Sequence, residues 1–151
     1  MITIKQVDKD YCKSFQLCED DLKEKEALGI PYDFDDEAIV AHAIELNGKP
    51  LAIGGIHEDV IWLLTSPTVQ ELGLMKKSKF VRAVKAWLRM SQICNPEVPF
   101  FYNIVWSGLP NHHKFIETMG GIIDYDRPIQ VETDEDFYVF HIVNPYHKAK
   151  E

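Results

Sequence analysis

The chain has 151 residues, of which 46% are hydrophobic and 26% charged, a balance typical of one globular domain. This composition excludes a disordered tail, a collagen-like fibre and a coiled coil, and no apolar run reaches the roughly 18–20 residues that cross a bilayer. The N-terminus lacks a secretory pattern, and the three cysteines have no CxxC spacing. We therefore expect a single domain over residues 1–151 in a reducing cytoplasm, without a membrane span, disulfide framework or metal site.

Charge is unevenly distributed along the chain, whose formal net charge is −8. Residues 73–91 contain six basic residues and no acidic one, whereas the rest of the chain has ten basic and 24 acidic residues. An acidic body repels a duplex, so nucleic acid is disfavoured as a partner. The basic segment is either a solvated helix face or a site for a compact polyanion, such as the phosphates of a coenzyme. Its basic residues are Lys76, Lys77, Lys79, Arg82, Lys85 and Arg89.

The beginning of the chain predicts a strand followed by one helix. Residues 2–7 alternate as in a short strand, and Asp8 or Asp10 can cap the helix that follows. Gly29 suits the left-handed position at a helix end, and Pro31 prevents continuation. The apolar face of this helix is expected to hold Tyr11, Phe15, Cys18 and Leu22.

The middle of the chain predicts an antiparallel meander of three strands. Residues 38–46 are rich in β-formers, residues 50–56 are apolar again, and the Asn47–Gly48 pair between them is a strong hairpin signal because both residues tolerate positive φ. Residues 57–59 form a second turn. Residues 60–65 are almost continuously hydrophobic, which predicts a central strand.

The second half of the chain predicts two helices and three strands. The basic helix has apolar residues at helical spacing from Phe80 to Leu88, including Trp87, and ends at Asn95–Pro96. A shorter helix runs to Met119 and stops at a glycine pair. The strands are expected at residues 100–106, 122–125 and 137–143, before a frayed tail from Asn144. The resulting order, β-α-βββ-α-β-α-ββ, indicates an α+β fold with a mixed sheet in which crossovers pair strands in parallel.

The loop and helix start after the third meander strand have the layout of a phosphate cradle. Free N–H groups at a helix N-terminus favour an anion, and Lys76 and Lys77 add positive charge there. The loop contains one glycine, Gly73, and neither a P-loop nor a dinucleotide signature. A basic surface helix without a ligand therefore remains the alternative.

This order of elements, with a phosphate-type loop after the fourth strand, resembles the GNAT N-acetyltransferase superfamily. Four short stretches between Pro50 and Ile123 resemble, more narrowly, the small internal virion protein family of short-tailed bacteriophages, whose members are GNAT-like. The resemblance implies a GNAT-like, acyl-CoA N-acyltransferase fold, with a mixed, splayed sheet of six or seven strands flanked by helices. The stretches are Leu51–Gly55, Leu63–Ser66, Asn103–Trp106 and Lys114–Gly120.

The resemblance implies acetyl-CoA as cofactor, in a V-shaped gap where the fourth and fifth strands splay apart. The pantetheine arm would pair with the main chain of the fourth strand, the pyrophosphate would lie on the loop and helix start, and Asn111 or His112 would touch the coenzyme. The coenzyme-binding residues are therefore expected to be Leu63, Leu64, Thr65, Gly73, Leu74, Met75, Lys76, Lys77 and Asn111.

The resemblance also implies acetyl transfer to an amine, which needs a base for the amine and a proton donor for the departing thiolate. The tyrosine that usually donates this proton is replaced here by Ile116. Glu58 or His57 is then the candidate base, and Tyr102 or His113 the candidate donor. For the histidines, polar turn or helix-capping roles are the alternative.

Two functional interpretations follow. The first is an acetyl-CoA-dependent N-acetyltransferase from a phage, acting on a small-molecule or protein amine in the host cytoplasm. The alternative is a catalytically weak or inactive GNAT-fold phage protein, which binds a virion or host protein and can be part of the virion. The replacement at Ile116 favours the alternative.

Overall fold

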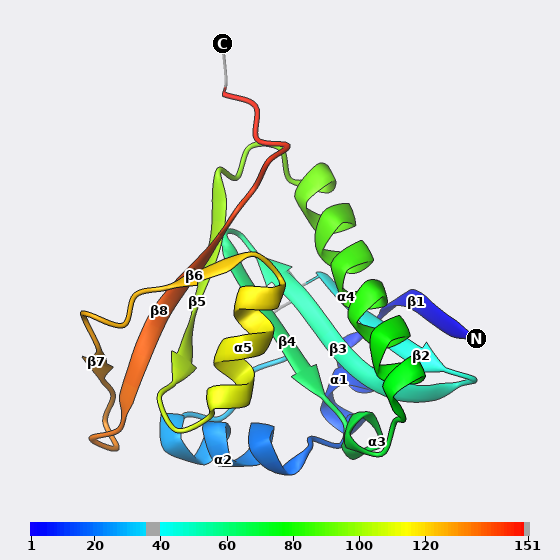
Figure 1. Ribbon diagram of the computed structural model, residues 1–151, viewed down its shortest axis with the longest axis horizontal. Coiled ribbons are helices and arrows are strands. Elements are labelled where there is room, and N and C mark those ends of the chain that lie inside the picture. The colour runs from blue at the N-terminus through cyan, green and yellow to red at the C-terminus, as the bar shows by residue number, and fades with distance from the viewer. Residues whose placement is uncertain (36–39, 150–151) are drawn as a thin grey trace.

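A mixed β-sheet with helices on both faces forms the body of the protein, as the computed structural model of residues 1–35 and 40–149 describes it (Figure 1). Its strands are β1 (Ile2–Val7), β2 (Val40–Leu46), β3 (Lys49–His57), β4 (Val60–Thr65), β5 (Phe100–Trp106), β6 (Gly121–Ile123), β7 (Ile129–Gln130) and β8 (Asp136–Val143). The helices are α1 (Lys9–Ser14), α2 (Glu19–Leu28), α3 (Pro67–Gln70), α4 (Leu74–Cys94) and α5 (Pro110–Thr118). The eight-stranded sheet has the order β1-β2-β3-β4-β5-β8-β6, with β7 beside β8. The predicted α+β fold with a mixed sheet is confirmed, and the two-residue β7 adds a strand to the expected number.

The predicted meander of β2, β3 and β4 is confirmed. Asn47 and Gly48 have φ values of 51° and 84° in the β2–β3 hairpin, and Glu58 has a φ of 58° in the next turn. All neighbouring strands from β1 to β4 pair antiparallel. The first two residues of the strand expected from residue 38 lie outside the described residues.

The prediction of a single helix after β1 is wrong, because the chain forms two helices there. Asp8 caps α1 by accepting a hydrogen bond from Tyr11 N, and the chain then leaves helical geometry at Phe15. Cys18 is the N-cap of α2, and its thiol accepts a weak bond from Asp21 N. This second start turns Asp21 inward and leaves Leu22 52% exposed, so Leu22 does not belong to an apolar face. The predicted end at Gly29 is confirmed, with a φ of 74°.

The strands β4 and β5 are parallel, joined by the α4 crossover as predicted, but they share a single register pair, Val60 with Tyr102. Beyond this pair they diverge toward their C-terminal ends (Figure 1). The crossover through α5 does not pair β6 with β5, because β8 lies between them and is antiparallel to both. The sheet therefore has a gap between β4 and β5, flanked by α4 and α5.

The side of α4 that was predicted to be apolar packs on the sheet. Phe80, Val84, Trp87 and Leu88 are all buried in one cluster with β5 residues such as Phe101. Trp87 lies directly over Gly54, where a Cβ would be 2.9 Å from the indole ring, so only glycine leaves room for the ring. A second cluster on the other face joins α1 to β2, β3 and β4 and contains Cys12, Ala41, Ala43, Ile53 and Leu64.

The prediction of a frayed tail from Asn144 onward is wrong for residues 144–149. The Asn144 side chain is buried and donates hydrogen bonds to the carbonyls of Gln92, Asn95 and Val98. Lys148 N donates to Pro96 O. These bonds hold the segment after β8 against the end of α4 and the loop that follows it. No helix within residues 1–35 and 40–149 is long and apolar enough to cross a membrane.

Replacing Trp87 with alanine is expected to lower the free energy of unfolding by about 3–5 kcal/mol, because it empties the space over Gly54 at the centre of the core. Met90→Ala is the matched control on the same helix, since Met90 is 37% exposed, and should cost less than about 1 kcal/mol. Urea denaturation measures both. Equal stability of the two variants would contradict this packing of α4.

Candidate functional site

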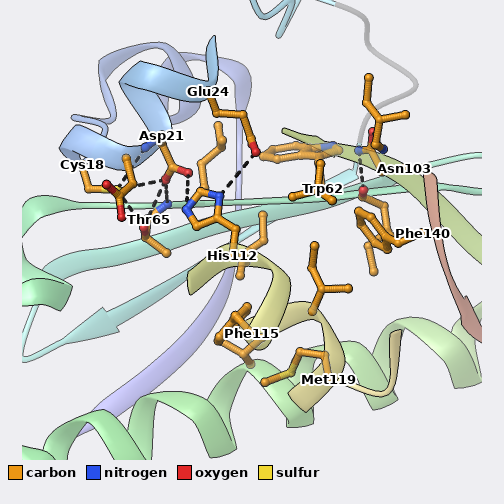
Figure 2. A pocket seen from close by; sticks show the side chains of 18 of the residues that line it. Cys18, Asp21, Glu24, Trp62, Thr65, Asn103, His112, Phe115, Met119 and Phe140 are labelled. Carbon is orange, nitrogen blue, oxygen red and sulfur yellow. Dashed lines mark hydrogen bonds and ion pairs between the residues drawn. The ribbon is translucent and has the colours of Figure 1, made fainter. Parts of the chain in front are cut away.

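The gap between β4 and β5 opens into a cavity of about 690 Å³. Its walls come from both strands and from α4 and α5, and they are mainly apolar (Figure 2). Polar side chains gather at one end, where α2 crosses the open ends of the strands (Figure 1). Large apolar side chains in the lining are Trp62, Phe80, Trp87, Phe115, Met119 and Phe140.

Two carboxylates of α2 bind the main chain of the two splayed strands. Asp21 accepts hydrogen bonds from Thr65 N on β4, at 2.7 Å, and from Thr65 Oγ1, at 3.1 Å. Glu24 accepts one from Trp106 N on β5, at 3.1 Å. Residues three apart lie on the same side of a helix, so one helix face reaches both strands. The two carboxylates thus bridge the gap at its open end.

The imidazole of His112, in the first turn of α5, lies between these two carboxylates (Figure 2). Its Nε2 is 3.6 Å from Asp21 Oδ1 and its Nδ1 is 3.4 Å from Glu24 Oε2. Burial alone would lower the pKa of His112, but the hydrogen bond to Glu24 and the charges of Glu24 and Asp21 outweigh it and raise the pKa above 6.5. The two carboxylates therefore favour the imidazolium form of His112, which can pair with both of them.

Cys18 completes this group at the N-terminus of α2. Its thiol lies 3.3 Å from Asp21 Oδ2 and 3.2 Å from Thr65 Oγ1, and its main-chain N donates to Thr65 O at 2.9 Å. Burial raises the pKa of the Cys18 thiol, and burial also raises that of Asp21 above 3.8 in spite of its hydrogen bonds. We call Cys18, Asp21, Glu24 and His112 the mouth cluster.

The donor atoms of Asp21, Glu24 and His112 lie within 4.8 Å of one another, a spacing that a divalent cation could also use. The two imidazole nitrogens, however, face different carboxylates. A shared metal would need one nitrogen and both oxygens to converge on one point. The arrangement is therefore that of an ion-paired imidazolium.

The residues that were expected to bind the coenzyme fall into two groups. Leu63, Leu64, Thr65 and Asn111 line the cavity. The segment Gly73–Lys77 begins α4 and is not among the lining residues. Gly73 is the N-cap of this helix and offers no side-chain cap, and Leu74 and Met75 are 89% and 79% exposed. The helix start is thus open to solvent, as a phosphate site would be.

Two residues of β4 already use their main-chain groups on the side of the gap. Thr65 N and Thr65 O are both bonded to α2, through Asp21 and Cys18. Further into the gap, Ile61 O accepts a hydrogen bond from Asn103 Nδ2 at 2.7 Å. An arm could pair with these groups only after α2 and Asn103 had moved away. The start of α4 carries two lysines in its first turn, whereas the Thr65 and Ile61 groups of β4 are already bonded within the chain.

Of the four residues expected to carry catalysis, three do not line the cavity, although Tyr102 lies beside the β3–β4 turn, where its main-chain N donates to Asp59 O at 2.9 Å. His57 lines the cavity, whereas Glu58 lies in the β3–β4 turn. Tyr102 is 37% exposed and is not among the lining residues. His113 has Nε2 2.8 Å from Trp106 O, and its ring packs against two tyrosines outside the cavity lining. Ile116, at the position of the usual tyrosine, lines the cavity without offering a proton donor.

Sequence reasoning missed Asp21 and Glu24 as site residues and named His112 only as a neighbour of the coenzyme. The available signal was the three-residue spacing of the two acids on one helix. That signal was weak, because α2 contains five acidic residues among ten. The prediction that Leu22 faces inward also placed Asp21 on the side of the helix that points away from the sheet.

Glu24→Gln is expected to weaken proton binding by His112 about tenfold, because it removes one of the two negative charges but keeps an acceptor for Trp106 N. An NMR titration of the imidazole ring measures this. Glu26→Gln is the matched control, since Glu26 is exposed on the same helix. Indistinguishable titrations of His112 in the two variants would contradict the ion pair.

Comparison with known proteins identifies sequence relatives among phage proteins. Residues 40–126 match the model of a family described as "Bacteriophage T7, probable scaffold protein Gp13". The chain is 30% identical over 135 residues to the "Probable scaffold protein gp13" of Escherichia phage T7, which covers 87% of this chain and 94% of that protein.

Solved structures with the same fold are N-acetyltransferases. The spermidine N-acetyltransferase of Vibrio cholerae, in complex with CoA and spermine, has a TM-score of 0.64 and 11% identity over 95% of each chain. The ribosomal-protein-S18-alanine N-acetyltransferase of Escherichia coli has a TM-score of 0.57 and 16% identity, and covers 100% of this chain and 97% of that one. At these identities the likeness shows the fold, which is the GNAT fold. By its sequence, the chain belongs to the family of the probable scaffold protein Gp13 of bacteriophage T7.

Proposed function

We propose that this chain is a phage assembly protein that uses a GNAT fold as a binding body and does not transfer acetyl groups. Membership of the scaffold-protein family supports the assembly role. The observation that carries the non-catalytic part is the bonding of Thr65 N and Trp106 N to Asp21 and Glu24. These bonds place the chain's own carboxylates where a coenzyme arm would have to enter.

Two further features support the same proposal. The proton donor usual in GNAT enzymes is replaced by Ile116, and of the other candidate groups Glu58, Tyr102 and His113 are not among the residues that line the cavity. The carboxylates of the mouth cluster and the nearby Asp20 also oppose entry of a polyanion such as a coenzyme. A fold retained without its chemistry is common, because fold does not fix function.

Acetyl-CoA-dependent transfer to an amine is the second candidate. The cavity of about 690 Å³, lined by Leu63, Leu64 and Thr65, favours it, as does the lysine-rich start of α4. The similar structures include enzymes for spermidine and for the alanine of a ribosomal protein, so a small or protein amine would be the acceptor. His57 or Glu58 would then be the base and Tyr102 or His113 the donor.

A triple variant, His57→Gln with Glu58→Gln and Tyr102→Phe, is expected to support phage yield as well as the wild type does when it is supplied to a phage that lacks this gene. It removes the candidate base and one candidate donor without emptying the core. The measurements are burst size and the protein composition of purified particles. Trp87→Ala is the control for loss of the fold and should fail.

The opposite outcome would favour the enzyme. It would consist of a soluble, folded triple variant that fails to restore phage yield, together with thiol release from acetyl-CoA that depends on an added polyamine or lysine peptide in the wild type. Loss of that release in Lys76→Glu with Lys77→Glu would then locate the coenzyme phosphates at the start of α4.

A further inference from the structure

The helix α2 is held across the open end of the gap by polar contacts. Of its ten residues only Asp21 and Ala27 are buried, and Leu22 is 52% exposed. A helix that buries so little apolar surface depends on its hydrogen bonds and ion pairs to stay in place. For α2 these are concentrated in the mouth cluster, with Thr133 Oγ1 donating to Ala27 O at the other end.

The contacts of the mouth cluster act on three different elements at once. Asp21 reaches β4 and Glu24 reaches β5, and both reach His112 on α5. Without its proton, His112 could no longer compensate two carboxylates at the same place. It would also lose one of its two N–H donors, so one carboxylate would lose a hydrogen-bond partner. Loss of one proton therefore weakens the contacts of α2 with α5 directly and leaves two uncompensated carboxylates at the ends of β4 and β5.

We propose that α2 is a latch that closes the gap between β4 and β5, and that it opens when the His112 imidazolium loses its proton. Opening would release Thr65 N and Trp106 N, two donors that suit the carbonyl or carboxylate oxygens of an entering chain. The inference goes beyond the proposed function, because it concerns the closed gap whichever partner the protein binds.

The charged and titratable groups around His112 set the direction of the pH dependence. From α2 these are Asp20, Asp21 and Glu24, with the Cys18 thiol at the helix start. The strands β4 and β5 add the main-chain donors of Thr65 and Trp106. Tyr32, after α2, lies near the same two carboxylates and Cys18.

The sign follows from the raised pKa of His112. In the closed state His112 binds its proton more tightly than at its ordinary value of 6.5, which we expect in the open state. The proton thus stabilises closure fully below 6.5, and this stabilisation is lost as the pH rises through the raised value. In acid, Asp21 takes up a proton above its ordinary pKa of 3.8 and loses the charge that faces His112. The latch is therefore firmest in mildly acidic solution and opens on the alkaline side.

Alkylation of Cys18 tests the latch directly, because this buried thiol lies under the start of α2. The full chain is treated with iodoacetamide at about pH 6 and about pH 9, and each cysteine is followed by peptide mass spectrometry. Cys94 is exposed and reports the pH dependence of the reagent, whereas Cys12 is buried in the other core cluster and reports global unfolding. We expect the rate at Cys18 to rise about tenfold or more relative both to Cys94 and to Cys12, whose thiol pKa is likewise raised by burial.

Two neighbouring variants separate the latch from a general effect. In His112→Gln, Cys18 should react fast already at about pH 6, and its rate relative to the other two cysteines should no longer change with pH. His113→Gln is the matched control, since His113 contacts Trp106 O and not the carboxylates, and should behave as the wild type.

Equal relative labelling of Cys18 at both pH values in the wild type would overturn the proposal, as would labelling of Cys18 that merely follows Cys12. If His112→Gln does not fold, the pH dependence of the wild type decides alone. No coenzyme or partner is present in this assay, so its failure would leave the proposed function untouched.

Discussion

Two main-chain N–H groups, those of Thr65 and Trp106, face the place where the sheet opens, and the rest of the site depends on how they are satisfied. A buried donor without a partner costs about 1–3 kcal/mol, so splayed strands persist only where acceptors are supplied from elsewhere. Here Asp21 and Glu24 supply them from one face of α2. Their two charges require a cation, and His112 on α5 provides it. The positions of α2 and of the start of α5 follow from this single requirement.

The same requirement explains how the sequence of a scaffold-protein family and the fold of acetyltransferases occur in one chain. A GNAT sheet has a gap in its middle whether or not an enzyme uses it. In this chain Phe115, Met119 and Phe140 line the apolar part of the gap, and α2 crosses its polar edge (Figure 2). The start of α4 carries lysines and has no side-chain cap, but it supplies no catalytic group to the gap.

The sequence predicted the parts of the fold that depend on local patterns. The Asn47–Gly48 hairpin, the central strand β4 and the inward side of α4 follow from turn chemistry and periodicity, and the structure confirms them. The place of β8 between β5 and β6 depends on pairing between distant strands, and the anchoring of Asn144 depends on carbonyls near the end of α4. The mouth cluster was out of reach for the same reason, since Glu24 and His112 are 88 residues apart in the chain. The break between α1 and α2 was missed because apolar spacing continued through it.

Amide hydrogen exchange at Thr65 and Trp106, followed residue by residue by NMR, tests most directly whether α2 closes the gap. If the carboxylates of α2 hold these two N–H groups, both amides exchange slowly in mildly acidic solution. Asp21→Ala should then speed exchange mainly at Thr65, and Glu24→Ala mainly at Trp106. Fast exchange of both amides in the wild type, at the rate of exposed loop amides, would contradict the account, because the gap would then stand open to water and to any ligand.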